Sequence, residues 1–498
     1  MLNIQSPPLT VLPNMNRLIL TLLLAASARA AAPASVDWVE WSGSLLTRAK
    51  REDRFILLDL EAVWCHWCHV MDATTYQDPD AVALLRSKFI TVKVDQDARP
   101  DLSTRYEDYG WPATIVFDPA GHEIVKRQGY IAPREMVSML RAIIVDPTPG
   151  PSVTPDRPIE YATSPHLSAD LRAQLQANYR LRYDSKNGSW GFNQKFLDWD
   201  AVEYAMLLAR QGDAEAEKMA TQTLTAQLNL LDPAWGGVYQ YSTDGDWNHP
   251  HFEKIMQFQA ENLRIYALAY RQFHKPEYLL AAQAIRRYLK DFLTSPEGAF
   301  YTSQNADLID GKHSAAYFKL DDTARRRQGI PRIDKHTYAR ENGWAITALA
   351  VLYQVTGDEA CLNDALRAAR WIVDHRALEG GGFAHGEHDP AGPYLGDTLA
   401  MTRAFLSLYA ATKDQSWRDR ANQALKFIEA NLRNPAGAGY LAARGEQPER
   451  DDNAALARAA TAAQQPAIAE QAMRYVVTPQ VAREHTAAPA LLADSEMP

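Results

Sequence analysis

The hydrophobic and polar positions of residues 36–145 alternate between short apolar runs and helical patterns. The apolar runs have the length of β-strands, and the stretches between them carry apolar residues at the spacing of one helix face. The expected strands are 55–60, 90–95, 113–118 and 123–128, and the expected helices begin at Ser42, at the motif around Cys65, at Asp78-Pro79, at Pro100 and at Pro133. The resulting order, β-α-β-α-β-β-α, predicts a separate α/β domain.

A different pattern follows residues 146–165, which contain six prolines and few apolar residues and are expected to form a linker. From Leu167 onward, long segments show the 3.6-residue apolar period of amphipathic helices. A Gly-rich turn with an aromatic residue recurs after every second helix, at 188, 235, 297, 380 and 437. Residues 166–445 are therefore expected to form an all-α ring of helical hairpins, an (α/α)6 toroid, with an open helical solenoid as the alternative. Residues 446–498 are expected to be an Ala-rich tail that could belong to the last hairpin.

Residues 1–30 have the pattern of a signal peptide. Arg17 precedes an apolar run over Leu18–Ala26, and Ala28-Arg29-Ala30 fits an A-x-A cleavage site. The run is too short to span a membrane, and an uncleaved anchor or a tail is the alternative interpretation. We therefore expect a protein without a stable membrane span that works in the periplasm or is secreted.

Charge and cysteine content narrow the function. The formal net charge is −9 and no stripe of Lys and Arg is present, which argues against nucleic acid as a partner. The chain has three cysteines, too few for a disulfide-stapled scaffold. Two of them stand together in Cys65-His66-Trp67-Cys68-His69. This pair is therefore expected to be functional rather than structural.

The motif at residues 65–69 has three interpretations. C-x-x-C is a redox dithiol, C-x-x-C-H attaches a c-type haem, and two Cys beside two His could hold a metal. A haem does not explain the strand before the motif, and joint ligation by His66 and the two cysteines is awkward. The dithiol is favoured, with no metal and no cofactor expected. Cys65 would stand at a helix N-terminus, where the dipole and free N–H groups stabilise a thiolate, and a protonated His66 would lower its pKa further.

The predicted α/β domain resembles thioredoxin. The C-x-x-C motif lies at the first strand-to-helix junction, Asp59 stands six residues before Cys65, and Trp64 directly precedes it. Gly110-Trp111-Pro112 comes before the strand 113–118, where thioredoxins place a cis-proline loop.

This resemblance implies a role for each residue. Cys65 would attack a disulfide, and Cys68 would resolve the mixed disulfide. Asp59 would accept the proton of Cys68, and a cis Pro112 would bring backbone close to the dithiol. Candidates for the surface that meets a partner are Trp64, Trp67 and Trp111.

The whole chain resembles the spermatogenesis-associated thioredoxin-domain proteins. The matching motifs are CHWCHVM at 65–71, VDQDARPD at 94–101, Gly110-Trp111-Pro112, HFEK at 251–254, NAD at 305–307, ENG at 341–343 and LGDTLA at 395–400. The resemblance covers roughly residues 36–445. It implies a thioredoxin-like domain joined to a six-hairpin barrel like that of glycosidases and sugar epimerases. The chain departs from the family at Trp64, where a small residue is usual, and at Phe258-Gln259 and Asn305, which replace acids.

Two main hypotheses follow. The first is an extracytoplasmic thiol–disulfide oxidoreductase that acts on protein thiols or disulfides and uses its barrel to recognise a partner, a carbohydrate or a glycoprotein. The alternative is a sugar-active or sugar-binding barrel with an accessory thioredoxin-like domain. Its candidate residues are His251, Glu253, Asp307, Glu341 and Asp397, and Trp190, Trp235 and Tyr239 on the Gly-rich turns could stack a sugar or plug the ring. An inert scaffold is a third interpretation, against which the intact dithiol set argues.

Overall fold

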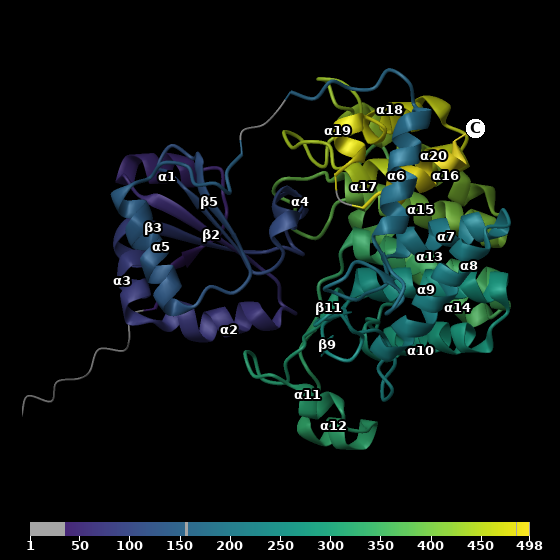
Figure 1. Cartoon of the computed structure of the whole chain (residues 1–498), viewed down its shortest axis with the longest axis horizontal. Coiled ribbons are helices and arrows are strands. Elements are labelled where there is room, and N and C mark those ends of the chain that lie inside the picture. Colours follow the sequence, from purple (N-terminus) through teal and green to yellow (C-terminus); the bar gives the residue numbers. More distant parts are fainter. Residues whose placement is uncertain (1–34, 155–157, 485, 498) are drawn as a thin grey trace, which may run out of the picture.

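The computed structural model describes residues 35–154, 158–484 and 486–497. The predicted signal peptide, residues 1–30, lies outside these ranges. Figure 1 shows an α/β domain beside a larger helical domain, connected by the proline-rich segment. None of the helices in the described ranges is long and apolar enough to cross a membrane.

The α/β domain is built on a five-stranded sheet in the order β1-β3-β2-β4-β5. Strand β2 is central: it runs parallel to β3 and antiparallel to β4, so that Leu58 faces both Val92 and Ile115. The segment that follows β2 therefore leaves the middle of the sheet. The strands are β1 Trp38–Val39, β2 Phe55–Glu61, β3 Phe89–Asp95, β4 Ala113–Phe117 and β5 Glu123–Gln128.

Alternation along β2 divides the core of this domain into two layers. Leu57 points into one apolar cluster with α2, α3 and α5, and Leu58 points into another with α1 and α4. Asp59, two residues after Leu57, lies on the same face as α2. The helices are α1 Leu45–Glu52, α2 His66–Thr74, α3 Pro79–Lys88, α4 Pro100–Tyr106 and α5 Pro133–Val145.

The helical domain is a closed ring. Its inner helices contact one another in the cyclic order α7, α9, α13, α15, α17, α20 and back to α7, and the outer helices α8, α10, α14, α16 and α18 each pack on the inner helix before them. Outer helix α6 packs on α20 and so joins the two ends of the domain. The predicted (α/α)6 toroid is confirmed, and the open solenoid is excluded.

The inner helices are α7 Trp199–Arg210, α9 Met256–Phe273, α13 Ala339–Thr356, α15 Leu395–Thr412, α17 Arg450–Ala462 and α20 Ala488–Glu496. The outer helices are α6 Ala169–Leu181, α8 Ala214–Gln227, α10 Pro276–Phe292, α14 Glu359–Arg376, α16 Gln415–Leu432 and α18 Pro466–Val476. Short helices are α11 Ala315–Phe318, α12 Asp322–Gln328 and α19 Pro479–Ala482. Two-residue strands are β6 Tyr183–Asp184, β7 Ser189–Trp190, β8 Tyr241–Ser242, β9 Pro250–His251, β10 Lys254–Ile255, β11 Ser303–Gln304 and β12 Ile333–Asp334.

Three of the recurring Gly-rich turns, at 235, 297 and 437, are each held by a buried amide side chain of the next inner helix. Gln259 of α9 accepts a hydrogen bond from the N–H of Val238 and donates one to its carbonyl. Asn342 of α13 and Asn453 of α17 hold their turns in the same two-way manner. Gln259, which departs from the family pattern, is therefore part of the ring's own architecture.

The ring extends past residue 445, where the sequence pattern placed its end. Small side chains on α17 let neighbouring helices approach closely, and α20 closes the gap between α17 and α7. Leu491 of α20 is fully buried in the core of the helical domain.

We expect Leu491→Ala to lower the free energy of unfolding by about 2–5 kcal/mol, because it leaves a cavity where the ring closes. Urea unfolding followed by circular dichroism measures this change. Leu280→Ala is the matched control: Leu280 lies on α10 and is 64% exposed, so its replacement should have little effect. Equal stability of the two variants would show that α20 does not close the ring.

Candidate functional site

The two cysteines of the C-x-x-C motif are joined in a disulfide at the start of α2. Cys65 is the residue that caps the helix, its Sγ accepts a hydrogen bond from the N–H of Cys68 at 3.1 Å, and the two Cα atoms are 5.3 Å apart. Both residues are buried, at 4% and 2% exposure. Helix N–H groups that point at a sulfur favour its thiolate form, which is the form that attacks disulfides.

The barrel covers this disulfide. Ile255 of β10 belongs to the same buried cluster as the two cysteines, and Phe258 of α9 and Trp111 pack against that cluster. The peptide bond between Trp111 and Pro112 is cis, as predicted. The loop and the barrel together therefore form the apolar walls around the sulfur atoms.

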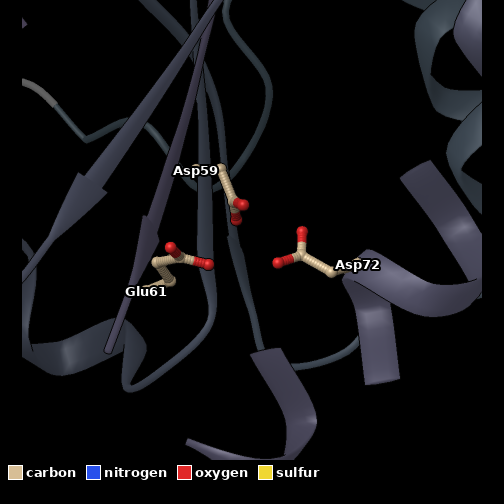
Figure 2. A group of neighbouring side chains, drawn as sticks. All are labelled: Asp59, Glu61 and Asp72. Carbon is tan, nitrogen blue, oxygen red and sulfur yellow. The ribbon is translucent and has the colours of Figure 1, made fainter. Parts of the chain in front are cut away.

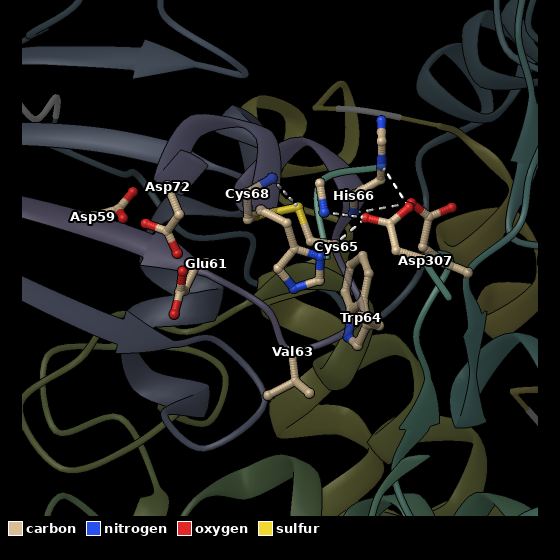
Figure 3. The surroundings of a disulfide bond; sticks show 12 residues. Asp59, Glu61, Val63, Trp64, Cys65, His66, Cys68, Asp72 and Asp307 are labelled. Carbon is tan, nitrogen blue, oxygen red and sulfur yellow. Dashed lines mark hydrogen bonds and ion pairs between the residues drawn. A yellow bond between two sulfur atoms is a disulfide. The ribbon is translucent and has the colours of Figure 1, made fainter. Parts of the chain in front are cut away.

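Asp307 of the barrel binds both histidines of the motif. Its Oδ1 lies 2.7 Å from His66 Nδ1, and its Oδ2 lies 3.3 Å from His69 Nδ1 (Figure 3). Burial alone would lower the pKa of His66, but the hydrogen bond and charge of Asp307 raise it overall. Asp307 therefore favours the protonated form of His66, the residue that follows Cys65.

Glu253, which lies between the short strands β9 and β10, approaches the same helix end. Its Oε1 lies 3.5 Å from the backbone nitrogen of His66, and its Oε2 has no hydrogen-bond partner among the described residues. Burial raises the pKa of Glu253 to about 7. His251 stacks on Tyr241 at 4.2 Å, and burial, together with the charges of His66 and His313, lowers its pKa to about 4.

A second cluster joins Trp64 to the remaining candidate residues of the barrel. Trp64 Nε1 donates to Asp97 Oδ2 at 2.7 Å, and the carbonyl of Asp97 lies 2.6 Å from His385 Nε2. The other ring nitrogen of His385 lies 2.9 Å from Asp397. Burial alone would lower the pKa of His385, but the charge and hydrogen bond of Asp397 raise this pKa overall. Both ring nitrogens of His385 face oxygen atoms. In the same region, Glu341 pairs with Arg340 at 3.0 Å.

Asp59 lies in an acidic group on β2 and α2 that also holds Glu61 and Asp72. Figure 2 shows the three carboxylates turned toward a common centre, and their oxygens lie within 4.8 Å of one another, close enough to hold a metal ion. Lys93 of β3 reaches that centre: its Nζ is 3.6 Å from Asp59 and 3.0 Å from Glu61, and it also bonds Asp72. The ammonium group thus supplies the positive charge that these acids require. Figure 3 shows the group lying apart from the disulfide, so the role predicted for Asp59 as proton acceptor of Cys68 stays a prediction.

The centre of the ring is filled by ion pairs between inner helices. Glu203 of α7 bonds Arg458 of α17 at 2.7 Å, and Glu261 of α9 lies 3.3 Å from Arg403 of α15. Neither pair joins neighbouring helices of the ring, so both cross its interior, and Arg264 links the two acids. The aromatic residues of the turns, Trp190, Trp235 and Tyr239, are buried in the core.

The structure thus brings Glu253 and Asp307 to His66 beside the disulfide, places His251 against Tyr241, and groups Trp64 with Glu341 and Asp397. Trp67 stands apart, 42% exposed and beside Tyr130. Sequence reasoning missed Asp97, His385 and Lys93. Asp97 stands inside the VDQDARPD motif and could have been singled out, whereas nothing in its own sequence context marked His385.

Comparisons with known proteins agree with this architecture. The family model Thioredox_DsbH, described as a protein of unknown function, DUF255, matches residues 21–145. Spermatogenesis-associated protein 20 of Mus musculus is 24% identical over 412 residues, which are 76% of this chain and 49% of the mouse protein. The chain thus spans about half the length of that relative.

Two further comparisons concern the separate domains. Thiol:disulfide interchange protein DsbD 2 of Pseudomonas aeruginosa is 36% identical over 81 residues, which are 16% of this chain and 14% of that protein. A crystal structure of D-mannose isomerase covers 68% of this chain and 99% of its own, with a TM-score of 0.50 and 12% identity, and shows the fold alone.

Fold and site define a protein in which a thioredoxin-like domain is joined to an (α/α)6 barrel. The resemblance of the sequence to the spermatogenesis-associated thioredoxin-domain proteins is confirmed.

We expect Asp307→Asn to lower the pKa of His66, because burial then acts without the opposing carboxylate. A histidine whose pKa is raised in the folded state stabilises the fold fully at pH values below its pKa in the unfolded chain, about 6.5. This stabilisation is lost as the pH rises through the pKa of the folded state. Asp307, whose pKa is lowered in the folded state, contributes stability at pH values above about 3.8, and this stability is lost as the pH falls through its folded-state pKa. The stability advantage of the natural chain over the variant should therefore be largest between these two limits.

Nuclear magnetic resonance titration of the His66 ring and chemical unfolding at several pH values measure these effects. Asp118→Asn breaks the exposed His–Asp pair with His122, which lies within the α/β domain, and serves as the control. An unchanged His66 titration in Asp307→Asn would contradict the assignment.

Proposed function

We propose that this protein is a thiol–disulfide oxidoreductase in which Cys65 and Cys68 form the redox couple. The observation that carries the proposal is the disulfide at the N-terminus of α2, directly after the central strand of a thioredoxin-like sheet and beside the cis Trp111–Pro112 bond. The similarity to a thiol:disulfide interchange protein over 81 residues supports it.

In the proposed reaction, the Cys65 thiolate attacks one sulfur of a substrate disulfide and forms a mixed disulfide, releasing the other substrate sulfur as a thiolate. Cys68 then attacks Cys65 Sγ, which restores the protein disulfide and releases the second substrate thiol. Run in reverse, the same steps oxidise two substrate thiols. The N–H of Cys68 and the protonated form of His66, which Asp307 favours, stabilise the Cys65 thiolate in either direction.

The barrel sets which partners reach the sulfurs in this proposal. Because both sulfurs lie beneath Ile255 and Phe258, the closed arrangement admits small thiols and disulfides, and a protein partner requires the barrel to move away from α2. We place the reaction in the periplasm or outside the cell, on the basis of the predicted signal peptide.

Sugar binding by the barrel is the second candidate function. A cavity of about 430 Å³ lies between the end of β5, the turn after β7, and the start of α7 and α20. Aromatic and amide side chains, the usual means of holding a sugar, line it. Its lining includes Gln128, Trp190, Phe192, Asn193, Gln194 and Phe196. The cavity lies away from the ion pairs that fill the ring.

We expect the natural chain to equilibrate reversibly with dithiothreitol, and Cys65→Ser and Cys68→Ser each to abolish the couple. Thiol labelling after acid quench, followed by mass spectrometry, counts the reduced cysteines. Cys361→Ala is the control, because this cysteine is buried in α14. A pair that never cycles would refute the redox function, and mannose titration of the cavity would then test the second candidate.

A second prediction concerns access to the disulfide. Phe196 lines the cavity and meets Phe258 edge to face, with ring centroids 6.4 Å apart, while Phe258 packs against the cysteines. We expect Phe258→Ala to speed reduction by glutathione several-fold and reduction by 2-mercaptoethanol less, because it removes a wall that excludes the larger thiol. Stopped-flow measurement of the reduction rate tests this. Phe273→Ala at the far end of α9 is the control, and equal acceleration with both thiols would contradict a size barrier.

A further inference from the structure

We propose that Glu253 of the barrel is the acid–base group of the disulfide site, exchanging a proton with the Cys65 sulfur. The inference rests on the proposed redox function and makes the catalytic site a product of both domains. The resemblance of this chain to thioredoxin assigns proton transfer to Asp59. Here the geometry points to a different carboxyl, supplied by the second domain.

The position of Glu253 is fixed by its chain neighbours. Lys254 is fully buried, and its Nζ bonds Asp232 at 2.7 Å and the carbonyl of Gly236 at 2.8 Å. Ile255 belongs to the cluster that contains Cys65 and Cys68. Because the residues that follow it are held this firmly, the Glu253 side chain is directed at the start of α2.

One carboxyl oxygen of Glu253 accepts a hydrogen bond, and the other has no partner among the described residues. Oε1 lies 3.5 Å from the backbone nitrogen of His66, one residue after Cys65, and Oε2 is buried without a hydrogen-bond partner among the described residues. A buried carboxyl oxygen without a partner is costly unless it holds a proton or meets a ligand. The residue as a whole is 4% exposed, so bulk water does not compete for this oxygen.

The other candidate groups differ from Glu253 in their partners or in their place. Both oxygens of Asp307 bond histidines. Asp59 also has a buried oxygen without a partner, Oδ1, but its Oδ2 pairs with Lys93 and its carboxyl group lies apart from the disulfide (Figure 3). His251 has a lowered pKa, and its ring stacks on Tyr241. Glu253 is the carboxyl with an unpartnered oxygen that also contacts the start of α2.

The charges around Glu253 allow it to titrate near neutral pH. The groups that face it are His66 on α2, Asp307 after β11 and Tyr241 on β8. Burial is the largest influence and raises the pKa of Glu253 to about 7, the range in which a group both donates and accepts protons efficiently.

The proposed step balances as follows. With Glu253 as carboxylate, it takes the proton of the Cys65 thiol, and the thiolate attacks a substrate disulfide. One substrate sulfur bonds Cys65 Sγ, and the other leaves as a thiolate. In the opposite direction, a substrate thiolate attacks the substrate sulfur of the mixed disulfide, the bond to Cys65 breaks, and protonated Glu253 gives its proton to the departing Cys65 sulfur. The substrate disulfide or thiol is the only co-reactant.

The test uses full-length protein with Glu253→Gln, which keeps the shape but cannot titrate. In the Cys68→Ser background, the rate of Cys65 alkylation by iodoacetamide is measured from about pH 5 to about pH 9. Because Glu253 and Cys65 are coupled, we expect two steps in the profile with Glu253 present and one step, at lower pH, with Gln. With both cysteines present, exchange with dithiothreitol near neutral pH should slow by roughly 10²-fold in Glu253→Gln.

Two further variants keep the outcome interpretable. Glu253→Asp retains a carboxyl and should restore a two-step profile, even if exchange stays slow. Glu446→Gln removes a different contact between the domains, the pair with Arg105 on α4, and should leave the profile unchanged.

The possible failures are distinguishable. If the natural chain does not cycle with dithiothreitol, the proposed function itself is wrong. If it cycles and the Glu253→Gln profile superimposes on that of the natural residue, the redox function stands and the role of Glu253 is overturned.

Discussion

The contact between the start of α2 and the barrel is the constraint on which the site depends. A helix N-terminus carries N–H groups without helical partners, and burying it requires acceptors from elsewhere. The barrel supplies one of them, because Glu253 meets the backbone N–H of His66, and Asp307 of the barrel binds the ring of the same residue. The same contact places the disulfide under apolar barrel residues, so the dithiol and the barrel share one site rather than standing as independent modules.

Arginine pairing distinguishes the acids inside the ring from the buried acids near α2. Glu203 and Glu261 pair with arginines, and these charges keep their pKa values low although both acids are buried. Burial raises the pKa of Glu253 to about 7 against the opposing effect of His66, and it raises the pKa of Asp59 to about 7 against that of Lys93. The cavity described above lies between the α/β domain and the barrel, lined by Gln128 of β5 and by residues at the start of α7 and α20.

Departures from the family pattern have local structural reasons. Gln259 holds the turn at Val238 through its amide, which requires both a donor and an acceptor. Asn305 accepts a hydrogen bond from the N–H of Asp307 and donates to Asp310, and it thereby shapes the loop that presents Asp307 to the histidines. Motif comparison could mark these positions as unusual, but it could not show that an amide performs a structural task there.

The sequence by itself determined the main strands of the α/β domain, the helices up to residue 445, the repeated turns and the dithiol at a helix start, because each depends on residues close together in the chain. Its resemblance to thioredoxin added the cis-proline loop. It also marked Glu253 and Asp307 as candidates, without placing them. Only the tertiary structure decided that they meet residues of the Cys65 motif, 187 and 241 positions apart from His66. Periodicity encodes which face of an element is buried, but which two faces meet depends on how the domains pack, and that information is spread over the whole chain.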